Sequence, residues 1–84
     1  MYKLKNDNER LSFADLRITI AEHLKTALGI EEFEITFARY EEELNTWRVN
    51  IEFKEEEFDR TALFNIDAKS GAVLEFKKGY VWRF

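Results

Sequence analysis

The most restrictive feature of this sequence is a change in hydrophobic periodicity at Gly29. Before it, apolar side chains recur every three or four residues across 13–28, the spacing of one face of an α-helix. After it, apolar and polar residues alternate in four short segments, as in strands with one buried face. Because 84 residues suffice for one core, we expect a single α+β domain over 1–84. It would pack one N-terminal amphipathic helix on a four-stranded antiparallel sheet, with a partly ordered tail at 1–10.

The predicted helix has sequence signals at both ends. Ser12 suits the N-cap, and Asp15 lies three residues later, where a carboxylate completes a variant of the capping box. Gly29 suits the position after the last turn, where a positive φ is needed. Ile18 points away from the apolar face. That face is expected to comprise Phe13, Leu16, Ile20, Leu24, Ala27 and Leu28.

The four alternating segments each place large apolar side chains on one side. Their connections are short, so neighbouring strands should pair antiparallel in a meander. The residues expected to face the core are Phe33, Ile35 and Phe37; Trp47, Val49, Ile51 and Phe53; Ala62, Phe64 and Ile66; and Leu74 and Phe76.

The segment 67–71 predicts the last turn of the sheet. Its aspartate can accept hydrogen bonds from the turn backbone, and its glycine can adopt a positive φ. The register that keeps the large apolar groups together pairs Ile66 with Ala72, Phe64 with Leu74, and Ala62 with Phe76. Leu63 and Val73 are then expected on the outer face of the sheet.

Composition narrows the classes of function. A net charge of −4 disfavours non-specific binding to nucleic acid or anionic lipid, since both are polyanions. The absence of Cys excludes disulfides, thiolate zinc sites and thiol nucleophiles. No stretch approaches the ~20 apolar residues of a membrane span. Residues 1–7 lack the apolar core of a signal peptide, so we expect a cytoplasmic protein that binds neither membrane nor nucleic acid.

Titratable residues offer little catalytic chemistry. His23 is the only histidine, and no second ligand or acid is spaced to share a metal or a triad with it. Glu31, Glu32 and Glu34 are expected to lie near 55–57, at the same end of the sheet. A cation site is conceivable there, but a solvated acidic rim is favoured because calcium sites are usually Asp-, Asn- and Gly-rich loops. We expect no enzymatic activity, no cofactor and no metal.

Apolar groups outside the core pattern are the candidates for binding. The final segment 79–84 alternates and is aromatic, so it could add a short fifth strand or cover the open end of the core. With Trp47 beside it, the same segment could instead form a docking surface. Self-association through an apolar patch and strand addition at an exposed edge strand are further alternatives. The candidate partner-binding residues are Leu63, Val73, Tyr80, Trp82, Arg83 and Phe84.

The stretch 16–76 resembles the PepSY-type domain. The shared features are the leading helix that ends at Gly29, two alternating strands, and a third strand that runs into the segment 67–74. The resemblance implies a helix on an antiparallel sheet, and a role as an inhibitory or protein-binding module without enzymatic activity.

The C-terminal half also resembles the gas vesicle accessory protein of the O type. The residues concerned are 47–53, 62–67, Gly71 and the aromatic, arginine-containing 80–83. This resemblance implies a cytoplasmic assembly factor that works through protein contacts.

The sequence therefore favours a small non-catalytic protein-interaction domain of PepSY-like architecture. An assembly accessory of the gas vesicle type is the first alternative. A small-ligand-binding or enzymatic domain is the second, and it would need a pocket with convergent polar groups under the helix. The inner faces predicted above are almost wholly apolar and offer few such groups.

Overall fold

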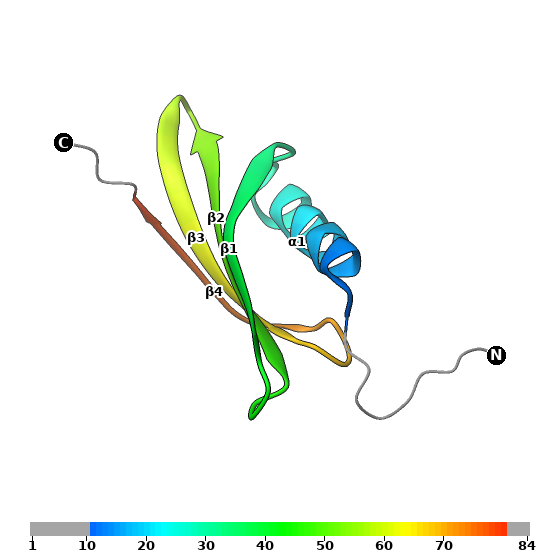
Figure 1. Ribbon diagram of the computed structural model, residues 1–84. Helices are drawn as coiled ribbons and strands as arrows, with labels where there is room; N and C mark the ends of the chain where they lie inside the picture. The colour runs from blue at the N-terminus through cyan, green and yellow to red at the C-terminus, as the bar shows by residue number, and fades with distance from the viewer. Residues whose placement is uncertain (1–10, 81–84) are drawn as a thin grey trace.

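A computed structural model describes residues 11–80 as one helix packed on one antiparallel sheet. Figure 1 shows the helix α1 lying along one side of the sheet, and no other described element covers the opposite side. The sheet order is β1-β2-β3-β4, so each strand pairs with its sequence neighbour and β1 and β4 form the edges. The predicted α+β meander is confirmed. The strands are β1 (Phe33–Glu41), β2 (Thr46–Glu55), β3 (Phe58–Asp67) and β4 (Val73–Tyr80).

The helix α1 (Phe13–Leu28) begins and ends where the sequence predicts. The Ser12 side chain accepts a hydrogen bond from the Asp15 backbone N–H at 3.1 Å, which satisfies one of the free donors of the first turn. Gly29 adopts φ 72°, and its N–H donates to carbonyls of the last turn. Both predicted caps are therefore confirmed.

One stripe of α1 is buried, and it is narrower than predicted. Leu16, Ile20 and Leu24 are fully buried. Phe13 is 50% exposed because it lies at the start of the helix, outside this stripe, and Ala27 is also exposed. The prediction that these two residues face the core is wrong.

The core is formed mainly by the two central strands beneath α1. Each places alternate side chains against the helix, as a half-buried antiparallel strand should. His23 contributes from the helix, with its ring 5.3 Å from that of Phe64 and 4.9 Å from that of Phe76. The buried residues of the sheet in this core are Val49, Ile51, Phe53, Ala62, Phe64 and Ile66.

A β-bulge in β1 changes which side chains face the helix. Pairing with β2 is regular up to Ile35 and shifts before Phe37, which lies opposite Asn50. The extra residue is Thr36, whose hydroxyl donates to the Asn50 carbonyl at 3.2 Å. Beyond it the alternation reverses, so Ala38 packs against the core and Phe37 is 45% exposed. The predicted core position of Phe37 is wrong for this reason.

A second bulge, at Leu74, makes the predicted register of the β3–β4 hairpin wrong. Ile66 lies opposite Val73, and the next pair is Asn65 with Glu75. Val73 therefore packs against the core while Leu74 is 60% exposed, the reverse of the prediction. The pairs that replace the predicted ones further along are Phe64 with Phe76 and Ala62 with Lys78.

The turn of this hairpin matches the prediction, although the register does not. Asp67 accepts hydrogen bonds from the backbone N–H of Ser70 at 2.8 Å and from its hydroxyl at 2.6 Å. Gly71 takes φ 82°, and its N–H donates to the Asp67 carbonyl at 2.8 Å. Leu11 is tied to the same end of the molecule through its N–H to the Ala68 carbonyl, at 2.8 Å.

Candidate functional site

The sheet face opposite α1, called the outer face here, carries apolar side chains at its centre. Strand pairing aligns Phe37, Asn50, Leu63 and Lys77 in one line across β1, β2, β3 and β4, and we call this line the central row. Phe37 is about half exposed, and Leu63 is partly exposed beside Asn50. An aromatic and an aliphatic group thus meet solvent on a face that no described element covers (Figure 1).

A shallow cleft of about 570 Å³ continues this surface toward the hairpin ends. Leu44, from the β1–β2 turn, and Leu74, from the β4 bulge, contribute its apolar surface and are 70% and 60% exposed. The hydroxyl-bearing Thr46 is 8% exposed between them. The remaining lining residues are Glu41, Arg48, Asn65 and Glu75.

The polar groups of the cleft hold one another in place. Asn65 donates its Nδ2 to Glu75 Oε1 at 2.6 Å, and Lys77 Nζ lies 3.2 Å from Glu75 Oε2. These contacts, first that with Lys77 and then that with Asn65, lower the pKa of Glu75 below its ordinary value, and the charge of Arg48 adds to the effect. These contacts therefore favour the charged form of the carboxylate.

The predicted partner-binding residues do not form one surface. Leu63 lies on the outer face as expected, but Val73 lies on the helix side and packs against the core. Tyr80 ends β4, opposite Arg60. The predicted contributions of Trp82, Arg83 and Phe84, and the predicted fifth strand at 79–84, involve positions outside the described residues.

Sequence reasoning missed three exposed apolar residues of the outer face. Regular alternation predicts Phe37 and Leu74 in the core, and the two bulges reverse it. Leu44 follows a run of glutamates in the β1–β2 turn. An apolar residue in an otherwise charged turn is the sequence signal that points to an exposed binding residue there. Trp47, considered for a docking surface, packs against the core instead and donates its Nε1 to the Leu11 carbonyl at 3.2 Å.

Glu31, Glu32 and Glu34 of the predicted acidic rim line a second cleft, of about 750 Å³, at the other end of the sheet, whereas 55–57 are not part of its lining. It opens between the 29–32 connection and the ends of β2 and β3. Lys54 brings a basic side chain to its lining and pairs with Asp59 at 3.1 Å. Among residues 11–80, no group of three or more side chains is arranged to hold a metal ion. The acidic lining consists of Glu31, Glu32, Glu34, Glu52 and Asp59.

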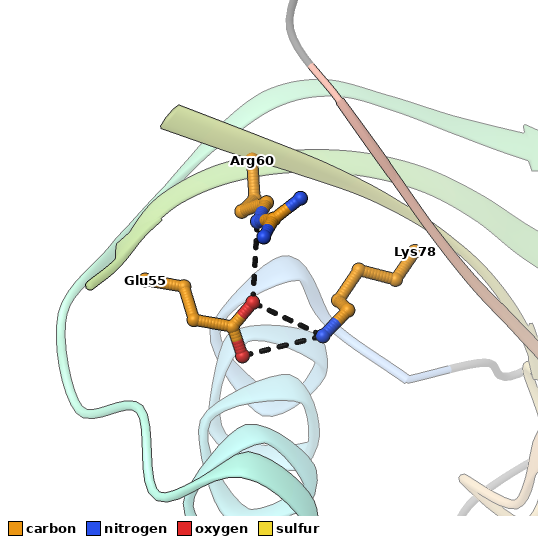
Figure 2. Close-up of polar contacts among 3 residues, drawn as sticks. All are labelled: Glu55, Arg60 and Lys78. Carbon is orange, nitrogen blue, oxygen red and sulfur yellow. Dashed lines mark hydrogen bonds and ion pairs between the residues drawn. The ribbon is translucent and has the colours of Figure 1, made fainter. Parts of the chain in front are cut away.

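Glu55, which was expected in that rim, instead joins three strands on the helix side (Figure 2). Its Oε1 lies 3.2 Å from Arg60 Nε and 3.0 Å from Lys78 Nζ, and its Oε2 accepts from Lys78 at 3.2 Å. The side chains of Glu55 and Arg60 are 23% and 17% exposed. The Glu55 carboxylate lies between two cations and links three strands beyond the apolar core, which is a structural role.

Comparisons with known proteins do not assign this chain to a family. No protein family, curated protein or solved structure matches the chain. Within residues 11–80, α1 is too short and too polar to cross a membrane.

Proposed function

We propose that this chain is a non-catalytic protein-interaction domain that binds its partner through the outer face of the sheet. The observation that supports this most is the surface formed by Phe37, Leu63, Leu44 and Leu74 on the face opposite α1. Burial of exposed apolar area is the main driving force of association, and exposed apolar patches rimmed by polar residues mark binding surfaces.

The arrangement of charge supports the same role. Charged side chains flank the central row on both sides, with Glu34 and Glu52 at one end and Arg39 and Arg48 at the other. An apolar centre with a charged rim is the usual anatomy of a non-obligate protein interface. The rim would set partner choice and orientation, while the centre would supply most of the affinity.

A ligand-binding or enzymatic role has less support. Such a role was expected to need a polar pocket under α1, and the space there is filled by fully buried Leu16, Ile20, Leu24 and Phe64. His23 packs on aromatic rings in the same layer. PepSY-like inhibition and gas vesicle assembly both stay predictions from sequence resemblance, and both are compatible with binding through the outer face.

Two matched variants test the proposal. Phe37→Lys places a charge in the central row, and Ile18→Lys places the same charge on the exposed side of α1, where Ile18 is 57% exposed. Each chain is immobilised, and proteins from an extract of the source organism, or the chain itself, are captured on it. We expect Phe37→Lys to lose what the parent captures and Ile18→Lys to retain it. Loss in Ile18→Lys alone would contradict the proposal.

A further inference from the structure

The chain enters the described part of the fold beside the cleft of the outer face. The Leu11 N–H donates to the Ala68 carbonyl at 2.8 Å, and the Ala68 N–H donates to the Asn45 carbonyl at 2.9 Å. Asn45 lies between Leu44 and Thr46 in the chain, and both of these neighbours line the cleft. Two backbone hydrogen bonds therefore connect the start of the described chain to the wall of the cleft.

The ten residues before Leu11 are long enough to reach the cleft. Backbones joined by hydrogen bonds lie about 4.8 Å apart, so two such steps place the cleft wall roughly 10 Å from Leu11. At about 3.3 Å per residue, the seven residues from Leu11 back to Leu4 span up to roughly 23 Å. A tether this short holds its end at a local concentration on the order of millimolar. Residues 2–5 can therefore pass round the hairpin ends to the outer face.

The sequence of residues 2–5 has a pattern that suits an apolar cleft open to solvent. Tyr2 and Leu4 alternate with Lys3 and Lys5, so an extended segment would place its two apolar side chains on one side and its two ammonium groups on the other. A segment of this kind can bury one side on a protein surface and keep the other side in water.

The cleft offers groups that match this pattern. Leu44 and Leu74 present apolar surface and are 70% and 60% exposed. Glu42 and Glu43, exposed in the β1–β2 turn, directly precede Leu44 and suit an occupant that carries lysines. The carboxylates within the lining already form ion pairs of their own, and the charge of Arg48 acts on one of them. A basic occupant also suits a chain whose net charge is −4.

From this placement we propose that residues 2–5 of the chain bind in the cleft and compete there with the partner. The apolar side of the segment packs on Leu44 and Leu74, and its lysines lie toward Glu42 and Glu43. The competition rests on the proposed function, because the cleft continues the surface proposed for the partner. A partner that uses the cleft must displace the segment, and its apparent affinity is reduced to the fraction of molecules in which the cleft is open.

Two matched variants of the full chain test the contact. Leu4→Glu and Asn8→Glu each add one negative charge within residues 1–10, but only Leu4 belongs to the segment proposed to occupy the cleft. Amide chemical shifts of the ¹⁵N-labelled variants are compared with those of the parent at low concentration. We expect Leu4→Glu to shift the signals of Leu44, Thr46 and Leu74, and Asn8→Glu to leave these signals unchanged. Circular dichroism confirms that both variants are folded.

Two results of this comparison would overturn the contact. One is a Leu4→Glu spectrum in which the three cleft signals stay at their parental positions. The other is a set of shifts confined to the start of α1, at Phe13 and Arg17, which would place the segment on the helix side instead.

Capture of the partner tests the competition and separates this inference from the proposed function. Leu4→Glu should bind the captured partner about two- to tenfold more tightly than the parent, because the cleft is open more of the time. Equal affinity would overturn the competition. If Phe37→Lys abolishes capture while Leu4→Glu shifts no cleft signal, the proposed function stands and this inference fails. If Leu4→Glu shifts the cleft signals while Phe37→Lys retains capture, the contact stands and the proposed function fails.

Discussion

Phe64 is the residue at which the two layers of the protein meet. Its side chain is fully buried in β3, and its ring packs against His23 from α1 and against Phe76 from β4. Edge-to-face contacts of this kind add to the free energy gained from burial itself. His23, the only histidine, thus contributes to packing.

Phe64→Ala should lower the free energy of unfolding by about 3–5 kcal/mol, because it removes a large buried ring and leaves a cavity. Phe58→Ala is the matched control, since Phe58 is 65% exposed at the start of β3, and its effect should stay within about 0.5 kcal/mol. Urea unfolding of both variants measures the difference. Equal midpoints for Phe64→Ala and the parent would contradict the packing described for the core.

Asp67 makes stability depend on pH. Hydrogen bonds from the Ser70 hydroxyl, and then from its backbone N–H, lower the pKa of Asp67 from 3.8. A carboxylate with a lowered folded-state pKa stabilises the fold above its ordinary pKa, and this contribution is lost as the pH falls through the folded value. Asp67→Asn should therefore be less stable than the parent at pH 6, and the difference should shrink when the pH falls below about 3.8.

Thermal unfolding of the parent and of Asp67→Asn between pH 6 and pH values below about 3.8 measures this difference in stability.

An NMR titration tests the cause of the shift. Ser70→Ala should raise the pKa of Asp67 toward its ordinary value, because it removes the Ser70 hydroxyl, the largest cause of the shift. A stability difference that does not change with pH would contradict the role given to the turn.

At the scale of elements, the ends of the helix and the last turn could be predicted, whereas the bulges could not. Ser12, Gly29 and Gly71 act through local backbone geometry, which residue type determines. The bulges at Thr36 and Leu74 depend on how two strands fit together, and neither residue type signals an insertion in the ladder. Each bulge therefore inverted the predicted face of the residues beside it.

The β2–β3 turn stores backbone strain. Glu56 and Glu57 adopt φ 53° and 72°, a left-handed conformation that costs a side-chain-bearing residue about 1–2 kcal/mol. Two-residue hairpin turns of this kind favour glycine. Glu57→Gly should therefore raise the free energy of unfolding by about 1 kcal/mol. This net gain is the strain that glycine relieves, less the cost of its larger backbone entropy in the unfolded chain.

Glu57→Ala separates strain from charge in the same unfolding experiment. It removes the carboxylate but keeps a Cβ, so its free energy of unfolding should rise much less than that of Glu57→Gly. Equal gains in the two variants would show that relief of repulsion in the acidic turn, and not backbone strain, is responsible.

At the scale of the whole molecule, the two faces of the sheet have different roles. The helix side is closed by α1 and, beyond the core, by the Glu55 cluster. The outer face is covered by no element between residues 11 and 80 (Figure 1). The sequence could predict that this face exists and that Leu63 lies on it. It could not predict the surface itself, because Phe37 and Leu74 reach it only through the bulges.

The most direct test of the claim that the outer face binds is to map chemical shifts of the ¹⁵N-labelled chain as the captured partner is added, or as its own concentration rises where the chain captures itself. The account predicts that amide signals of the central row, at Phe37, Asn50, Leu63 and Lys77, shift together, while those of the exposed side of α1 stay constant. Shifts confined to α1 would contradict binding through the outer face.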